Sequence, residues 1–315
     1  MNSLRWLAVV ALIVVVARLS SAAEDSGGGR RGGQRAKLTD ATIRSDQRLY
    51  RKTPEGELFL HFYYPAGWKA TDARPAIVLF FGGGWKTGSY RQLAPQAEYF
   101  ASRGLVAVAA DYRIKDKHQT TPDKAVEDAK SAMRWVRSHA GELGIDPKKI
   151  IAGGGSAGGH LATATALVED FDAADDDKSV SCKPCALVLF NPVVNLTKLP
   201  DRSLAKGQSD EIKKKLSPVF YLKASAPPAI LFFGTDDKYF PQGKEYVAKA
   251  KEIGARTDLY VAPGMSHGFF NRAPWTEVTT RQADEFLTSL GYLQGEPTIK
   301  LPADAPKLKL LPPAR

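Results

Sequence analysis

Gly154-Gly155-Ser156-Ala157-Gly158 lies near the middle of this 315-residue chain and decides how the rest is interpreted. This G-x-S-x-G sequence follows the segment 149–152, apolar from Ile150 onward, which predicts a strand, and opens an alanine-rich segment at 157–169, which predicts a helix. Only small neighbours fit around a serine on so sharp a turn, and the turn exposes its hydroxyl at a helix N-terminus, where negative charge is favoured. The context predicts that Ser156 is a nucleophile; a glycine-rich connecting loop is the alternative.

Strands and helices alternate on both sides of this turn. Residues 47–52 and 57–64 flank a Pro-Glu-Gly turn and predict an antiparallel hairpin. Apolar strands alternating with helices are typical of a mostly parallel sheet covered by helices on both faces. Further strands are expected at 76–81, 105–110, 186–189, 229–233 and 258–261, and further helices at 93–103, 122–143, 242–253 and 277–290. We expect one α/β domain over residues 41–294.

The two ends of the chain differ in composition from this domain. Residues 1–23 combine Arg5, an apolar run at 6–16 and small residues, which is the pattern of a cleaved signal peptide. The apolar run is short for a membrane span, so an uncleaved anchor is the lesser alternative, and the protein is expected to be exported. Residues 24–40 read as a flexible Gly/Arg-rich linker and 295–315 as an extended Pro/Lys-rich tail.

Composition limits the function classes. The chain has 43% hydrophobic and 25% charged residues, which are ordinary globular proportions, and a net charge of +10. A nucleic-acid-binding protein would gather such charge in one stripe, whereas here it is spread over both tails and along helices among acidic residues. We therefore expect no nucleic-acid partner.

The two cysteines, Cys182 and Cys185, form a C-x-x-C pair. A zinc site would need further ligands, and no second pair lies nearby. In an exported chain such a pair predicts a disulfide that closes a surface loop.

A second glycine-rich segment follows the strand predicted at 76–81. It reads Phe81-Gly82-Gly83-Gly84-Trp85. Glycines leave backbone N–H groups unshielded, as the oxyanion hole of an acyl-transfer site requires. A simple turn is the alternative.

These two motifs together resemble the esterase/lipase branch of the α/β-hydrolase fold, in which the second loop is of the H-G-G-G-W type. The resemblance implies that the N–H groups of Gly83, Gly84 and Ala157 form the oxyanion hole. The family histidine is replaced by Phe81, so packing must support the loop here.

The resemblance also implies a catalytic acid. Gly234-Thr235-Asp236-Asp237 follows the strand predicted at 229–233, and related hydrolases read G-T-x-D-x-x-x-P at this point. The acid is then Asp237, four residues before Pro241, with Asp236 as the alternative.

The catalytic base follows from position. His267 stands in a short loop between Gly264 and Gly268, after the last predicted strand, and the order Ser, Asp, His is the one this fold uses. The four remaining histidines are His61, His118, His139 and His160. They precede the nucleophile or lie inside its helix, so none of them suits this role.

Together these features predict a serine hydrolase that cleaves carboxylic esters without a metal or organic cofactor. The chain is similar to secreted acetyl-xylan and feruloyl esterase-like (BD-FAE-like) hydrolases, which implies acyl esters on carbohydrate or other small molecules as substrates. Trp85, Tyr239 and Phe269 flank the catalytic loops and are candidates for substrate contact. A prolyl-oligopeptidase-like peptidase and a non-catalytic binding protein are the alternatives. Oligomeric state stays open, and no stable membrane anchor is expected.

Overall fold

A computed structural model describes residues 37–200 and 207–311 of the chain. The predicted signal peptide and residues 24–36 of the predicted linker lie outside these ranges. Residues 37–40 have no regular secondary structure, and Leu38 is buried in the hydrophobic core. None of the helices in the described residues is long and apolar enough to cross a membrane.

Nine strands of the described residues form one sheet, in the order β1-β2-β4-β3-β5-β6-β7-β8-β9. Neighbouring strands from β4 through β8 pair in parallel, whereas the hairpin at one edge and β9 at the other pair antiparallel. The strands are β1 (Arg44–Thr53), β2 (Gly56–Tyr64), β3 (Arg74–Phe80), β4 (Val106–Ala110), β5 (Ile145–Gly155), β6 (Leu187–Phe190), β7 (Ala229–Gly234), β8 (Thr257–Ala262) and β9 (Lys309–Leu311). The predicted α/β architecture is confirmed.

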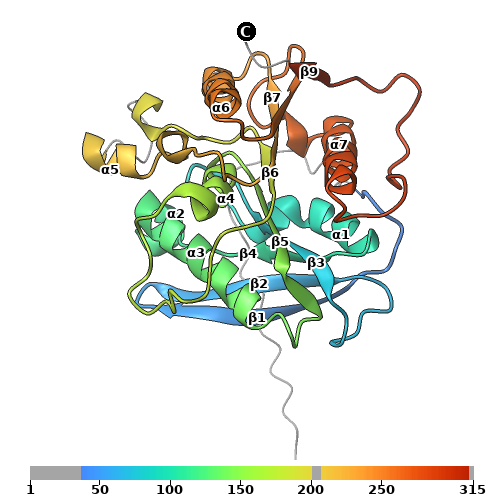
Figure 1. Ribbon diagram of the computed structural model, residues 1–315, viewed down its shortest axis with the longest axis horizontal. Coiled ribbons are helices and arrows are strands. Elements are labelled where there is room, and N and C mark those ends of the chain that lie inside the picture. The colour runs from blue at the N-terminus through green and yellow to red at the C-terminus, as the bar shows by residue number, and fades with distance from the viewer. Residues whose placement is uncertain (1–36, 201–206, 312–315) are drawn as a thin grey trace, which may run out of the picture. The chain divides into compact units, whose positions relative to one another are not determined.

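Helices cover both faces of the sheet (Figure 1). Helices α3, α4 and α6 contribute to one hydrophobic cluster, and α1 and α7 contribute to the other. The helices are α1 (Ala94–Ser102), α2 (Lys115–His118), α3 (Pro122–Ser138), α4 (Ala157–Leu167), α5 (Asp210–Lys215), α6 (Phe240–Glu252) and α7 (Trp275–Ser289). Helix α3 is five residues shorter than predicted, because the chain turns after it and Ile145 N donates to Ala140 O at 2.9 Å to begin β5.

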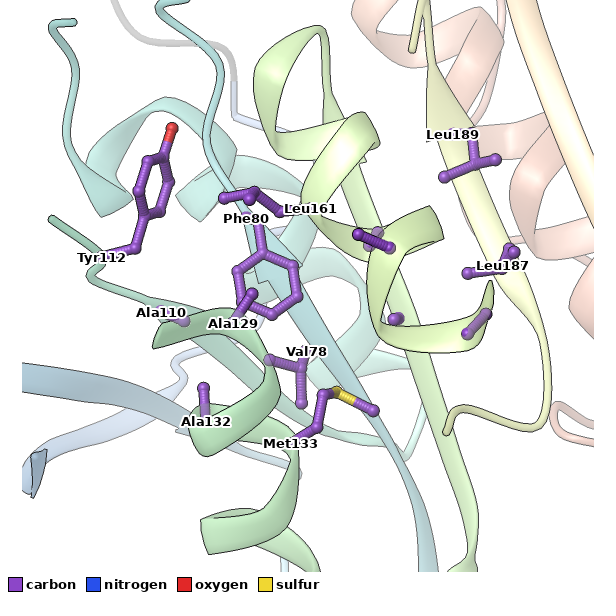
Figure 2. Close-up of a cluster of buried hydrophobic side chains, with 14 of the residues drawn as sticks. Val78, Phe80, Ala110, Tyr112, Ala129, Ala132, Met133, Leu161, Leu187 and Leu189 are labelled. Carbon is purple, nitrogen blue, oxygen red and sulfur yellow. The ribbon is translucent and has the colours of Figure 1, made fainter. Parts of the chain in front are cut away.

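Small residues let the central helices pack closely on the sheet. Figure 2 shows Val78 and Phe80 of β3 beside Ala129 and Met133 of α3 and Leu161 of α4. These side chains are fully buried, which is worth about 1.5–3 kcal/mol for each large apolar side chain. This packing fixes the position of α4, and with it the turn that carries Ser156.

The C-terminal segment makes specific contacts with the domain. Residues 309–311 form β9, which extends the sheet beyond β8. Thr298 N donates to the Tyr99 hydroxyl at 3.2 Å, and Arg281 donates to the Ile299 carbonyl at 2.9 Å. The segment is therefore tied to α1, α7 and β8.

The predicted disulfide is wrong: Cys182 and Cys185 are both free thiols. Cys182 packs in the cluster with α3 and α4, and its Sγ donates to the Thr165 carbonyl at 3.5 Å. Cys185 packs against the cluster on the opposite face of the sheet and hydrogen-bonds with Tyr292. The two side chains therefore diverge, and burial raises the pKa of both thiols.

Candidate active site

The turn between β5 and α4 holds Ser156 in a strained conformation, with φ of 53° and ψ of −114°. Positive φ is unfavourable for a residue with a side chain and tends to occur at functional sites. The turn also forces close backbone approach, since a methyl group on Gly158 would overlap the carbonyl of Phe80. Ser156 N donates to the Phe190 carbonyl at 2.9 Å, which ties the turn to β6. Local sequence and neighbouring strands together project the hydroxyl at the carboxyl end of the sheet.

Three side chains that the sequence singled out form a continuous hydrogen-bond series. His267 Nδ1 lies 2.7 Å from Asp237 Oδ2, and His267 Nε2 lies 2.8 Å from Ser156 Oγ. Because a carboxylate accepts, Nδ1 carries the ring proton and Nε2 accepts from the serine hydroxyl. The arrangement has the geometry of a nucleophile, a base and a group that orients the base.

The two neighbouring carboxylates after β7 have different environments. The Asp237 side chain is 0% exposed, and its second oxygen accepts from Tyr239 N at 2.8 Å. Asp236 is exposed and accepts from the Thr235 hydroxyl at 3.1 Å. Of the two, the structure brings Asp237 to His267.

The glycine loop after β3 lies beside the serine. Gly82 N donates to Gln92 Oε1 at 2.5 Å, so this N–H is already used. The Gly83 carbonyl accepts from Lys86 N and Thr87 N, both at 3.1 Å, which closes the loop into a tight turn. Gly83 and Gly84 line both cavities that reach Ser156, and Ala157 begins α4, where its N–H has no acceptor within the helix. The three expected oxyanion donors are therefore grouped around the serine.

Phe81 supports this loop by packing. Its ring is 2% exposed and stacks on Tyr112, with ring centroids 4.1 Å apart. The Tyr112 hydroxyl donates to the Phe81 carbonyl at 2.7 Å, so ring and backbone are held by the same residue. Phe81 lines neither cavity that reaches Ser156.

Replacing Phe81 by histidine, the residue of the related loops, should leave kcat within a few-fold, because the side chain does not reach the serine. Stability should fall by about 1–3 kcal/mol if the imidazole finds no partner in this apolar site. Gly83→Ala should instead lower kcat about 10²–10³-fold, the usual loss of one oxyanion donor, since φ is +130° and the new methyl group would overlap the Thr87 carbonyl.

Measuring kcat and melting temperature together separates the two effects. Gly84→Ala is the comparison for Gly83→Ala: it keeps the backbone N–H, and a methyl group there meets nothing within 4 Å, so kcat should fall less, with only the positive φ of 65° opposing the change. A large change of kcat in Phe81→His at unchanged melting temperature would contradict a hole built from backbone alone.

His160 connects the glycine loop to the segment after α5. Trp85 Nε1 donates to its Nδ1 at 3.3 Å, and its Nε2 donates to the Leu216 carbonyl at 2.7 Å. Complete burial lowers the pKa of His160 to about 4, so it stays neutral at ordinary pH. Its role is to hold Trp85, whose φ is +58°, next to α4.

Two cavities meet at Ser156. The larger, of about 1010 Å³, is bordered by the glycine loop, α2, the segment around Val193 and Leu199, and Tyr239. The smaller, of about 310 Å³, is bordered by His267, Gly268, Phe270 and Asn191. An ester bound at the serine can therefore extend in two directions.

The three aromatic candidates for substrate contact differ in placement. Tyr239 lines both cavities and Trp85 lines the larger one, although most of the Trp85 side chain is buried. Phe269 lines neither: it is 5% exposed and packs on Trp275 in the core, because the loop turns it away from the serine. The expectation for Phe269 is corrected, and its neighbour Phe270 lines the smaller cavity instead.

Sequence reasoning missed Asn191. Its Oδ1 accepts from Gly268 N at 3.0 Å, so it holds the loop that carries His267. Its own backbone is strained, with φ of 39°, and N donates to the Phe232 carbonyl at 2.7 Å. The sequence offered one signal for this role: an Asn-Pro pair just after the strand that follows the serine in the chain.

The other histidines lie away from the serine or are held in structural contacts. His61 contacts Asp111 at 3.1 Å and stacks on Tyr90, while His118 Nδ1 accepts from Ile114 N at 3.0 Å. In the described ranges no group of three or more His, Cys, Asp or Glu residues could hold a metal ion.

Fold and site together define an α/β hydrolase with a serine, a histidine and an aspartate in series. A family model described as BD-FAE matches residues 60–251, which is more than half of the chain. The chain belongs to the BD-FAE family, within the α/β-hydrolase esterases.

Solved structures agree with this membership. The chain is 43% identical to Thermogutta terrifontis esterase 2 phosphorylated by paraoxon, with a TM-score of 0.75, covering 80% of this chain and 96% of that one. The propionate-bound form of the same esterase is 42% identical, with a TM-score of 0.74 and the same coverage.

Curated relatives are carboxylic ester hydrolases by name. The probable carboxylic ester hydrolase LipM of Mycobacterium tuberculosis is 29% identical over 74% of this chain. The probable isoprenylcysteine alpha-carbonyl methylesterase ICMEL1 of Arabidopsis thaliana is 26% identical over 70% of this chain. The chain spans 59% and 50% of their lengths, respectively.

Proposed function

We propose that this protein hydrolyses carboxylic esters, with Ser156 as nucleophile, His267 as general base and Asp237 as the residue that orients the base. The observation that carries the proposal is the unbroken hydrogen-bond series from Asp237 through His267 to Ser156, next to the glycine loop.

In the first half-reaction Ser156 Oγ attacks the ester carbonyl carbon while its proton moves to His267 Nε2. The Asp237 carboxylate accepts a hydrogen bond from Nδ1–H, without taking the proton, and stabilises the imidazolium that forms. The N–H groups of Gly83, Gly84 and Ala157 donate to the oxygen of the tetrahedral intermediate, each worth about 2.7–4 kcal/mol. The intermediate collapses, Nε2 returns the proton to the departing alcohol, and an acyl-serine remains.

The second half-reaction repeats this chemistry with water. His267 takes a proton from a water molecule that attacks the acyl-serine, and then protonates Ser156 Oγ as the acid is released. His267 carries out every proton transfer in this cycle, so the proposal includes no metal or organic cofactor.

We further propose that the substrates are acyl esters of carbohydrates or other small molecules, met outside the cytoplasm after export. Membership of the BD-FAE family and the signal-peptide pattern at residues 1–23 support this assignment. Tyr239 borders both cavities and offers an aromatic face on which a sugar ring can stack. The propionate bound to the related esterase supports a short acyl group.

A substrate panel tests the reaction class. We expect 4-nitrophenyl esters of short acids to be hydrolysed and aminoacyl arylamides to be left intact. An organophosphonate should label Ser156, identified by peptide mass mapping, and abolish the hydrolysis. Preference for the arylamides would favour a peptidase, and absence of turnover and labelling together would favour a binding protein.

A further inference from the structure

The larger cavity carries an excess of positive charge next to Ser156. Of the residues that the structure describes, Lys86, Lys115 and Lys238 line it, and Asp116 is the acidic residue in that lining. All four side chains belong to exposed residues. An exposed lysine alone means little, but three lysines against one aspartate among the described residues that line this cavity give it a positive local field.

Backbone hydrogen bonds hold two of these lysines, Lys86 and Lys115, next to the glycine loop. Lys115 N donates to the Trp85 carbonyl at 2.9 Å, and Asp116 N donates to the Lys86 carbonyl at 3.0 Å. These paired bonds join the loop to the start of α2. The backbones that carry both charges are therefore held beside the proposed oxyanion donors Gly83 and Gly84.

Lys238 approaches the serine from the opposite loop. It stands between Asp237 and Tyr239, and it lines both cavities that reach Ser156. Its Nζ lies 4.8 Å from the centre of the Tyr239 ring. The ammonium group thus lies beside the aromatic face that borders both cavities.

The positive charge is not neutralised within the described part of the chain. None of these three lysines has a carboxylate of a described residue within 4.0 Å, whereas basic residues of α3 are paired, as Lys130 is with Asp172 at 3.0 Å. An anion entering the cavity would therefore meet ammonium groups free to bind it.

We propose that the cavity selects esters that carry a second, anionic group, a carboxylate or a sulfate, bound among Lys86, Lys115 and Lys238. This inference rests on the proposed ester hydrolysis and specifies its substrate class. A cleft lined mainly by one sign of charge concentrates ligands of the opposite sign, typically raising association by about 10–10³-fold, and salt weakens the effect. Sugar acids and sulfated sugars bearing acyl groups have this chemistry.

The test compares esters matched in everything except charge. The carboxylate pair is 4-acetoxybenzoate and 4-acetoxybenzamide, and the sulfonate pair is 4-acetoxybenzenesulfonate and 4-acetoxybenzenesulfonamide. Each kcat/KM is divided by the rate constant for alkaline hydrolysis of the same ester, which removes differences in leaving-group reactivity. We expect the anionic member of at least one pair to be favoured about 10-fold at low salt and much less at high salt.

Substitutions then locate the charge responsible. The triple variant Lys86→Gln, Lys115→Gln, Lys238→Gln should bring the anionic-to-neutral ratio close to one. The matched control is Lys69→Gln, Lys148→Gln, Lys183→Gln, which removes the same charge from exposed positions at the amino ends of β3, β5 and β6. The control should keep the wild-type ratio. Asp116→Asn should raise it, since it removes the opposing charge.

The outcomes separate this inference from the proposed function. If the wild-type protein hydrolyses both members of each pair at equal normalised rates, the charge inference is overturned and ester hydrolysis stands. If no acetyl ester is hydrolysed, both fail. If the control variant lowers the ratio as much as the cavity variant does, the preference comes from overall charge and the assigned site is wrong.

Discussion

Ser156→Ala should lower kcat for ester hydrolysis about 10⁶-fold, which is the size of effect seen when a serine nucleophile is removed from such a series. The hydroxyl oxygen lies 2.8 Å from His267 Nε2, and in residues 37–200 and 207–311 no other side chain hydrogen-bonds with this nitrogen. Alanine has the same Cβ as serine, so the strained turn is retained and the melting temperature should change little. Stopped assays with a 4-nitrophenyl ester and thermal unfolding measure both quantities.

Ser89→Ala is the control for this substitution. Ser89 is exposed, lies near the glycine loop and makes no side-chain hydrogen bond to the short helix that it precedes. Its replacement should leave both activity and labelling by an organophosphonate unchanged. More than about one per cent of the wild-type rate in a pure, folded Ser156→Ala sample would mean that another residue is the nucleophile.

The order of the elements was predictable because the hydrophobic pattern of an α/β domain is strong. Strands buried on both faces, such as β4 and β6, read as unbroken apolar runs, and α3 has an apolar stripe at helical spacing. Strand β9 was not predictable, since Lys309–Leu311 is too short to show a pattern and pairs with β8 through contacts far away in sequence.

The candidate site divides in the same way. Ser156 and the glycine loop are local motifs, so sequence alone placed them. Asn191 acts by accepting a hydrogen bond from Gly268, 77 residues away in the sequence. The disulfide prediction failed because the two cysteine side chains lie on opposite faces of the sheet. Both outcomes depend on which strands become neighbours, and spacing along one chain does not contain that information.

Asp237→Asn should lower kcat about 10⁴-fold, because an asparagine side chain favours the wrong imidazole tautomer. Asp237 now accepts from His267 Nδ1 at 2.7 Å and from Tyr239 N at 2.8 Å. An amide NH₂ turned toward the ring would donate to Nδ1, so the ring proton would move to Nε2 and the serine would lose its acceptor. The backbone bond from Tyr239 should survive through the amide oxygen, and the loop should keep its shape.

Asp236→Asn is the matched comparison, with the same chemical change one residue earlier. Because Asp236 is exposed and contacts Thr235 rather than the histidine, its variant should retain kcat within a few-fold. The two variants should also differ in their rate of labelling by an organophosphonate. Asp237→Asn should react far more slowly than Asp236→Asn, since labelling needs the activated serine hydroxyl. If Asp236→Asn shows the large loss and Asp237→Asn the small one, then Asp236 orients the base during turnover, and the hydrogen bond between Asp237 and His267 belongs to a resting arrangement that the reaction does not use.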